Sequence, residues 1–308
     1  MSEIWKVIIN PKAGNCKGAE EWPKIKDQLM KNGLSISFSF TEHIYHAIEL
    51  TKAAIRNGYR KFIAVGGDGT LHEVVNGIFD QKAVPTTDFT IAAIPIGTGN
   101  DWGRLYSFPR DYEAAAKIIA ACKTKMQDIA KVVVMKNNRP STRYMVNIGG
   151  MAFDAYTCHL FSKLKEKGKS GKSLYMTGLL QGFTKYKSRL FNIRINGEPF
   201  YEGKVFSTAF GIGKYSGGGM IQTPEALPDD GILEVTVIKK ISRLKILLNL
   251  ARLFKGTLFA LPEVLHTKAQ TVDIESTPSS FVEVDGESVG ESKLHIEMLP
   301  VALNVVVP

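Results

Sequence analysis

The chain has 308 residues, of which 44% are hydrophobic and 22% are charged, and its formal net charge is +9. This length suits two domains, and the composition is that of a folded protein, which excludes an intrinsically disordered chain.

The first part of the chain alternates between strand-like and helix-like patterns. Strands are predicted at residues 4–10, 34–40, 61–65 and 90–96, and helices at 19–32, 43–57, 71–79 and 111–122. Gly33 and Gly58 follow the first two helices, where glycine commonly ends a helix. The pattern predicts an α/β domain at residues 1–130, with an open parallel sheet wrapped by helices.

The second part, residues 131–308, is predicted to be a mostly antiparallel, β-rich domain, a sandwich or barrel. Helical segments interrupt it near 155–187 and 241–255. Asn196-Gly197 and Asp285-Gly286 are typical two-residue hairpin turns between strands. The pattern leaves open whether the last strand, residues 300–308, returns to the first domain.

Positive charge is concentrated in two segments. Residues 159–190 hold eight Lys/Arg and one acidic residue, and residues 239–255 hold six Lys/Arg and no acidic residue. Local positive charge is typical of surfaces that meet phosphates, nucleic acid or anionic lipid. Few aromatic residues accompany these segments, so we expect no nucleic-acid partner.

The three cysteines, Cys16, Cys122 and Cys158, are widely spaced and form no CxxC pair. This favours a reducing compartment and argues against a zinc site. The N-terminal segment shows no signal-peptide core, and no apolar run approaches the roughly 20 residues that span a membrane. We therefore expect a cytoplasmic protein.

Three glycine-rich turns follow predicted strands, at residues 10–14, 66–70 and 95–101. The carboxyl ends of parallel strands share one edge of the sheet, where ligands bind in open α/β folds. Glycines let backbone N–H groups approach a phosphate, and a helix start adds its positive end. Thr70 and Glu73 have capping-box spacing, which predicts the start of the third helix. One such turn can be a simple strand–helix connection, but three on one edge favour a phosphate site.

Asp68 lies at the centre of the second turn, where a bare carboxylate would repel phosphate. Mg²⁺ prefers one or two carboxylates together with phosphate oxygens. We therefore expect Asp68 to recruit the metal of Mg–ATP. The alternative is an aspartate that caps its own turn.

The motifs NPKAG (10–14), GGDGTLHEVVNG (66–77) and PIGTGND (95–101), followed by LPDDGILEV (227–235) and VDGE (284–287), resemble the diacylglycerol kinase catalytic-domain family. That family includes bacterial lipid kinases and is related to sphingosine and ceramide kinases. The likeness extends along essentially the whole chain, and it implies an active site between an α/β nucleotide domain and a β-rich domain.

The resemblance assigns roles by position. It implies nucleotide contacts from Asn10, Thr41, Gly66, Gly67, Asp68, Gly69, Thr70, Leu71, His72, Gly97 and Thr98. Asp68 would act in magnesium–phosphate binding, and Glu287 would be the catalytic base that takes the proton from a lipid hydroxyl. A single carboxylate base is what phosphoryl transfer requires.

Leu227, Asp230 and Ile232 match a structural metal site of the family, in which Asp230 gives its carboxylate and the other two give carbonyls. Such oxygen ligands suit Mg²⁺ or Ca²⁺. The alternative is a plain turn before the following strand. Asp128 lies where the family often has an acidic residue, which makes it a possible metal partner, whereas Asp101 is expected to have a structural role.

The resemblance favours an ATP-dependent lipid kinase, most readily one that converts diacylglycerol to phosphatidate. GGDGT is shared with NAD kinases, so an NAD kinase-like phosphotransferase is the nearest alternative, and a non-enzymatic nucleotide-binding module is the next. Bacterial relatives suggest a homodimer. Residues 147–160 and 169–183 resemble the family only loosely, which leaves the lipid acceptor open.

A lipid kinase must reach a membrane surface. Residues 241–255 place Leu244, Leu247, Leu248, Ala251 and Phe254 on one helical stripe beside basic residues. Such a helix can rest on anionic lipid as a peripheral contact at the inner membrane face. The alternative is that the stripe packs on the β-rich domain.

Overall fold

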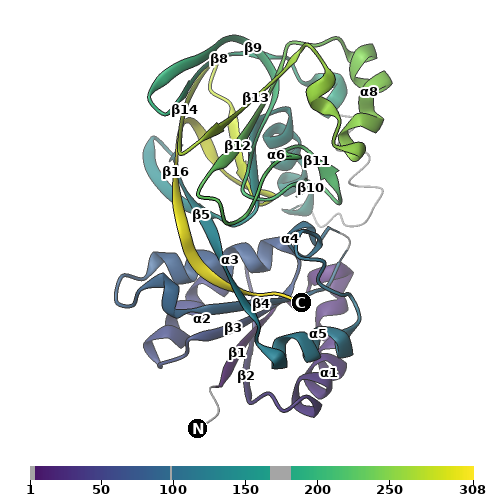
Figure 1. Ribbon diagram of the computed structural model, residues 1–308, viewed down its shortest axis with the longest axis vertical. Coiled ribbons are helices and arrows are strands. Elements are labelled where there is room, and N and C mark those ends of the chain that lie inside the picture. The colour runs from purple at the N-terminus through teal and green to yellow at the C-terminus, as the bar shows by residue number, and fades with distance from the viewer. Residues whose placement is uncertain (1–3, 98, 167–181) are drawn as a thin grey trace. The chain divides into compact units, whose positions relative to one another are not determined.

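The computed structural model describes residues 4–97, 99–166 and 182–308 (Figure 1). The chain forms two compact units, one of residues 1–128 with 300–308 and one of residues 129–299. The chain leaves the first unit within strand β5 (Thr124–Lys136) and returns to it within strand β16 (Glu287–Val306). The sequence placed this boundary at residues 130/131.

The first unit is a parallel α/β fold, as predicted. Its strands lie in the order β2-β1-β3-β4-β16, and every pairing is parallel. The strands are β1 (Trp5–Ile9), β2 (Ile36–Phe40), β3 (Lys61–Gly66), β4 (Thr90–Pro95) and the end of β16. The helices are α1 (Ala13–Lys31), α2 (His46–Arg56), α3 (Asp68–Asp80), the 3-10 helix η1 (Thr86–Asp88), α4 (Asp101–Leu105) and α5 (Tyr112–Ala121).

The central strands of this sheet are apolar because helices cover them. Val7, Ile63 and Val65 are fully buried and pack with Ile25 of α1 and Ile119 of α5. A parallel strand with both faces buried has a continuous apolar run rather than alternation, which is the pattern found at residues 61–65. Because β1, β3 and β4 are parallel, their carboxyl ends and the three turns that follow them lie at one edge of the sheet.

Helices α1 and α3 begin earlier than predicted, at Ala13 and Asp68. Helix α1 contains left-handed residues at Gly14, Asn15 and Cys16, so its regular part begins close to the predicted residue 19. The capping-box prediction is wrong, because α3 begins at Asp68 with no side-chain cap. The Glu73 carboxylate instead accepts N–H groups at the start of α2, at 3.0 Å each.

The second unit is an antiparallel β structure, as predicted. Following its pairings, β9-β7-β15-β16-β14-β8 leads back to β9, so six strands enclose a core, and β12 and β13 extend it. The strands are β6 (Arg139–Met145), β7 (Ile148–Ala152), β8 (Arg189–Ile195), β9 (Glu198–Gly211), β10 (Tyr215–Ser216), β11 (Met220–Ile221), β12 (Leu233–Lys239), β13 (Val264–Ala269), β14 (Thr271–Thr277) and β15 (Phe281–Val284). The helices are α6 (Phe153–Glu166), α8 (Arg243–Lys255) and the 3-10 helix η2 (Leu258–Ala260).

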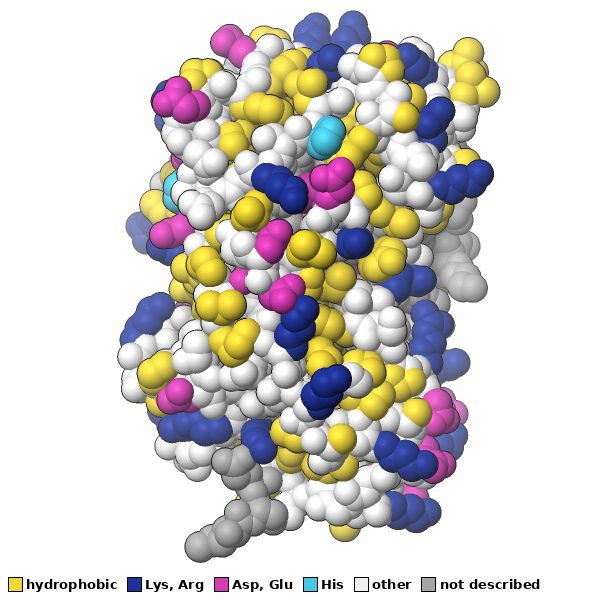
Figure 2. All heavy atoms as spheres, viewed as in Figure 1, with side chains coloured by type: hydrophobic (Ala, Val, Ile, Leu, Met, Phe, Trp, Pro, Cys, Tyr) yellow, Lys and Arg dark blue, Asp and Glu magenta, His cyan; other side chains and the backbone are white. Residues whose placement is uncertain are grey.

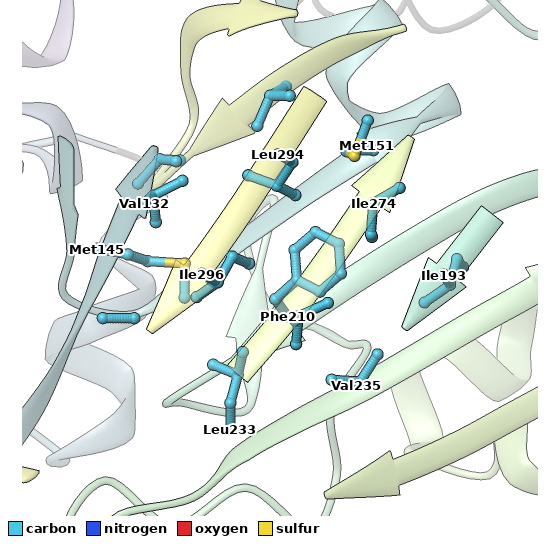
Figure 3. Close-up of a cluster of buried hydrophobic side chains, with 14 of the residues drawn as sticks. Val132, Met145, Met151, Ile193, Phe210, Leu233, Val235, Ile274, Leu294 and Ile296 are labelled. Atoms are coloured by element: carbon cyan, nitrogen blue, oxygen red, sulfur yellow. The ribbon is translucent and has the colours of Figure 1, made fainter. Parts of the chain in front are cut away.

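The enclosed core is made of alternating inward-facing residues. Figure 3 shows Phe210, Val235, Ile274 and Leu294 pointing toward one another from four different strands. Both predicted hairpins are present, since Ile195 pairs with Glu198 and Val284 pairs with Glu287 across two-residue turns.

Strand β12 contains a buried acidic residue. Glu234 lies between Leu233 and Val235 in β12 and is only 2% exposed. Burial raises the pKa of Glu234 to about 7, against the lowering effect of the backbone N–H groups of Glu225 and Ala226.

Within the described part of the chain, no helix combines the length and the apolar character that crossing a membrane requires. The basic segment predicted at 159–190 is described only in part, because residues 167–181 lie outside the described residues.

Candidate active site

The three glycine-rich turns of the first unit lie against one another. A Cβ atom on Gly14, whose φ is +60°, would be 3.3 Å from the backbone nitrogen of Gly97. A Cβ atom on Gly99 would be 3.2 Å from a carboxylate oxygen of Asp68. The first and third turns therefore touch, as do the second and third, which confirms that they share one edge of the sheet.

Gly66 has a packing role in this arrangement. A Cβ atom on Gly66 would come within 2.3 Å of the Thr70 hydroxyl oxygen, so a larger residue is excluded. The carbonyl of Gly66 also accepts the N–H of Ile96 at 2.7 Å, which ties the second turn to the third. The first glycine of the motif thus lets the turn close tightly.

The Asp68 carboxylate connects two of the turns. Its oxygens accept the backbone N–H groups of Asp101 and Trp102, both at 3.1 Å. These two residues begin α4, so Asp68 satisfies N–H groups that have no partner within that helix. The sequence expected either a metal ligand or a cap of its own turn, and the structure shows a cap of a neighbouring turn.

This cap does not use all of the accepting capacity of Asp68. Each carboxylate oxygen has two lone-pair directions, so an oxygen that accepts one N–H group can still meet a cation or its water. The carboxylate is therefore chemically suited to a magnesium ion, and its role in magnesium binding stays a prediction.

Two further predicted nucleotide residues follow neighbouring strands. Asn10 follows β1, and its side-chain oxygen accepts the N–H of Lys12 at 3.0 Å. Thr41 follows β2, and its N–H donates to the carbonyl of Ile9 at 2.8 Å. Both residues therefore lie at the edge of the sheet where the turns meet.

The other predicted nucleotide contacts are placed differently. The side chains of Thr70, Leu71 and His72 are buried in α3, which gives them a packing role. Thr98 lies outside the described residues. The contacts of all four with a nucleotide stay predictions.

In the second unit, Asp285 anchors the hairpin that carries Glu287. One Asp285 oxygen accepts the N–H of Val146 at 3.0 Å, and the other accepts those of Asn147 and Ile148 at 2.9 and 3.2 Å. Asp285 is buried and has a φ of +51°, which aspartate tolerates better than most residues. Three buried N–H groups thus hold this turn in place.

A second buried carboxylate supports the same turn. One oxygen of Glu283 accepts the N–H of Gly286 at 2.9 Å. Burial raises the pKa of Glu283 well above its usual value, and the nearby charges of Asp154, Asp285 and Glu287 raise it further. Glu287 itself is only partly buried, so the third carboxylate of the hairpin remains accessible.

Asp154, in the first turn of α6, is a neighbouring acid whose charge acts on Glu283. Its carboxylate accepts hydrogen bonds from the Ser207 hydroxyl at 2.6 Å and the Gln222 amide at 2.7 Å. Burial nevertheless raises the pKa of Asp154. A Cβ atom on Gly150 would be 3.2 Å from a Glu283 oxygen, so the glycine leaves room for that buried side chain.

Sequence reasoning missed the cluster formed by Asp154, Glu283 and Asp285. Glu283 lies in a run of buried strand residues, and Asp154 lies in a segment with only loose family resemblance. Asp285 was interpreted as a turn residue only. The available signal was the presence of three acidic residues within five positions, 283–287, beside a glycine-rich strand.

The predicted metal residues of the second unit form a turn before β12. One Asp230 oxygen accepts the N–H of Ile232 at 3.0 Å, and Leu227 is 48% exposed. The carboxylate and the two carbonyls are ligands of the kind that a hard cation takes. The metal assignment of Leu227, Asp230 and Ile232 stays a prediction.

Two other aspartates of the first unit have structural contacts. Asp128 is fully buried, and its carboxylate accepts the N–H of Val301 at 2.7 Å, which ties β5 to the returning strand β16. Asp101 begins α4 and lies 3.6 Å from the guanidinium of Arg104. The predicted role of Asp128 as a metal partner stays a prediction.

Sequence comparisons identify relatives over nearly the whole chain. A model of the diacylglycerol kinase catalytic domain matches residues 5–132, and one of the YegS C-terminal NAD kinase beta sandwich-like domain matches residues 152–307. A diacylglycerol kinase of Staphylococcus aureus strain bovine RF122 is 30% identical, over 93% of this chain and 86% of its own. The Staphylococcus carnosus enzyme of the same name is 28% identical, over 95% and 94%.

Solved structures share the fold. A diacylglycerol kinase from Bacillus anthracis gives a TM-score of 0.72 at 22% identity, covering 100% of this chain and 97% of its own. Yeast NADH kinase in complex with NADH gives a TM-score of 0.57 at 13% identity, covering 100% and 84%. At these identities the likeness concerns the fold alone.

We expect Asp285→Ala to destabilise the second unit. It removes the acceptor of three buried N–H groups, so the free energy of unfolding should fall by about 2–4 kcal/mol. Asp285→Asn, which keeps one oxygen, should lose less. Urea unfolding measures this, with Asp88→Ala, at an exposed aspartate, as the control. A loss below about 0.5 kcal/mol for Asp285→Ala would contradict the anchoring role, since that is the scale of ordinary surface changes.

Proposed function

This chain belongs to the diacylglycerol kinase family, and on that premise we propose that it transfers the γ-phosphate of ATP to the hydroxyl of diacylglycerol, giving phosphatidate. The family makes it an ATP-dependent lipid kinase, a phosphotransferase with an alcohol group as acceptor. The observation that carries the proposal is the meeting of three glycine-rich turns at one edge of the parallel sheet.

In this proposal, the backbone of the three turns binds the phosphates of ATP. Their N–H groups lie at the carboxyl edge of the strands, and α3 and α4 begin there. Glycines at positions 66, 67, 97 and 99 keep side chains away from the anion. In the proposal, this edge holds the phosphates of ATP and aligns the γ-phosphorus for attack.

Asp68 is the residue that would hold Mg²⁺ beside the phosphates. When bound, the ion neutralises phosphate charge and orients the phosphate oxygens. Asp68 supports this role by being fixed, since two N–H groups from α4 hold its carboxylate at the meeting point of the second and third turns.

Glu287 is the proposed base. Its carboxylate takes the proton of the lipid hydroxyl while that oxygen forms a bond to the γ-phosphorus and the bond to the bridging oxygen of ADP breaks. Glu283 and Asp285 do not touch the substrate in this proposal. They position Glu287, because Glu283 accepts the N–H of Gly286 within the turn and Asp285 ties the turn to residues 146–148.

An NAD kinase-like activity is the second candidate. The NAD kinase beta sandwich-like match at residues 152–307 favours keeping it. The relatives named diacylglycerol kinase cover 93% or more of this chain, which favours the lipid kinase. A transfer assay that includes NAD distinguishes the two candidates by their products.

Helix α8 supplies a surface suited to a membrane. Leu244, Leu247, Leu248 and Phe254 are 68%, 57%, 76% and 53% exposed, and no residue of α8 is buried. The predicted stripe therefore does not pack on the β-rich unit. Figure 2 shows hydrophobic and basic side chains next to one another over α8. We propose that this face rests on an anionic bilayer, where the protein meets its lipid substrate.

The base assignment predicts that Glu287→Gln loses most phosphoryl transfer, by about 100-fold or more, because glutamine accepts no proton. The fold and ATP binding should remain. Radiolabelled ATP is supplied with diacylglycerol, monoacylglycerol, sphingosine, ceramide and NAD, and each product is counted. Ser288→Ala, at the next position of the same strand, is the control. Normal turnover by Glu287→Gln would exclude it as the base, and labelled NADP without labelled lipid would overturn the lipid kinase proposal.

For Asp68→Asn we expect two effects that can be measured separately. Loss of the metal ligand should reduce turnover strongly at every magnesium concentration, and loss of one N–H acceptor should lower the free energy of unfolding by about 1–2 kcal/mol. Glu73→Gln is the control, because it alters a cap of α2 in the same way without touching the turns. Full activity with reduced stability would leave Asp68 with the capping role alone.

Membrane docking is tested on the exposed leucines. The double variant Leu247→Ser with Leu248→Ser should weaken binding to vesicles of anionic phospholipid by about tenfold or more, since burying one leucine contributes about 1.5–3 kcal/mol. Ile44→Ser, at a 67% exposed position of the first unit, is the matched control. Equal vesicle binding by the wild type and the double variant would remove α8 from the docking surface.

A further inference from the structure

Three side chains that commonly bind metals meet in the second unit, apart from the acidic hairpin. One ligand atom from each of Glu225, Glu234 and His266 lies within 4.8 Å of the others. Glu225 precedes β12, Glu234 lies in β12, and His266 lies in the neighbouring strand β13. In the antiparallel register His266 is opposite Thr236, two residues along β12 from Glu234, so both side chains stand on one face of the sheet.

The strongest indication of a ligand is a buried oxygen of Glu234. The side chain is 2% exposed, and its Oε2 atom accepts the N–H of Glu225 at 2.7 Å. Its Oε1 atom is also buried and accepts no hydrogen bond from any part of the chain that the structure describes. A buried carboxylate oxygen with no partner is unfavourable, and a cation is one of the few groups that can satisfy it.

The histidine is held in a defined orientation. Its ring stacks on that of Phe259, with the centroids 3.8 Å apart and the planes 9° from parallel. Stacking restricts rotation of the imidazole, which lowers the entropy lost when a ring nitrogen binds a metal. Glu225 and His266 are both exposed, so water can reach the cluster and complete a coordination shell.

We propose that Glu225, Glu234 and His266 form a site for a divalent transition cation, with Zn²⁺ as the best fit. Zinc accepts imidazole nitrogen together with carboxylate oxygen, whereas Mg²⁺ and Ca²⁺ prefer oxygen alone. Metal–ligand bonds of about 2 Å place ligand atoms roughly 3–3.5 Å apart on one ion. Rotation of the exposed Glu225 side chain would bring its carboxylate closer to the fixed Glu234 and the oriented His266 ring, and a small shift of that ring within its stack would close the remaining spacing.

The site contains no cysteine, so the expectation against zinc, which rested on cysteine spacing, does not apply to it. It is also distinct from the predicted oxygen-only site at Leu227, Asp230 and Ile232, because it uses an imidazole and different side chains. A bound ion would join the segment before β12 to both β12 and β13, and would therefore hold the loop that contains Asp230.

A second cluster in the first unit provides a contrast. His43, His46 and Glu49 also bring one ligand atom each within 4.8 Å of the others. The Nδ1 atom of His46, however, already accepts the N–H of Glu42 at 3.0 Å, and the cluster contains no fully buried member. We therefore propose no metal site at this cluster.

The test uses metal-free full-length protein. Zn²⁺ binding is measured by calorimetry, and Co²⁺ binding is measured by visible absorption, which reports histidine and carboxylate ligation without any activity assay. Glu225→Gln and His266→Ala change exposed residues, so they preserve the fold. We expect one Zn²⁺ per chain in the wild type, and affinity at least about tenfold lower in each variant, as even outer-sphere changes cost about 10–100-fold.

The matched control is His295→Ala. His295 is another partly exposed strand histidine beside a carboxylate, 2.8 Å from Asp273, and its loss should change Zn²⁺ affinity by less than about twofold. Asp230→Asn should leave Zn²⁺ affinity equally unchanged. No binding at one ion per chain, unchanged affinity in Glu225→Gln and His266→Ala, or a tenfold loss in His295→Ala or Asp230→Asn would each overturn the site. None of these measurements depends on the proposed kinase activity.

Discussion

The glycine-rich turn that contains Asp68 and the hairpin that contains Asp285 depend on the same kind of interaction. In each, a carboxylate accepts backbone N–H groups from a segment distant in the sequence. Asp68 accepts two from the start of α4, and Asp285 accepts three from residues 146–148. Glycine-rich turns have many accessible conformations, so an unanchored turn would lose entropy on binding a ligand. The carboxylates remove that cost in advance, which makes each turn a preformed element rather than a flexible loop.

The hairpin at residues 283–287 divides the work among its acids. Glu283 and Asp285 are buried and hold the backbone, whereas Glu287 is partly exposed and available for proton transfer. Asp68 combines both tasks in the proposed mechanism, because an oxygen that accepts one N–H group can still meet a cation. The raised pKa of Glu283 also makes the stability of the fold depend on pH. Since its folded pKa is raised, its contribution is greatest below the unfolded pKa, near 4, and is lost as pH rises toward the folded value.

The sequence predicted the two-domain fold, the parallel and antiparallel sheets, both hairpins and the common edge of the three turns, because all of these follow from periodicity and turn chemistry. It failed where a contact joins distant segments. Thr70 and Glu73 have the spacing of a capping box, yet Glu73 binds the start of α2, which no local spacing reveals. The role of Asp285 was missed for the same reason, since its partners lie more than a hundred residues earlier.

Periodicity also shows that a helix has an apolar face without showing what covers it. The stripe of α8 fits packing on a core and contact with lipid equally well, and only the exposure of residues such as Leu248 separates the two. Glu234 is a similar case, because it alternates with the core residues Leu233 and Val235 as an outward-facing polar residue would, and only the structure shows that it is 2% exposed. A buried acid conflicts with its surroundings, and such conflicts tend to mark functional sites. Its explanation needed a partner from another strand, and His266 becomes that partner only when β13 pairs with β12.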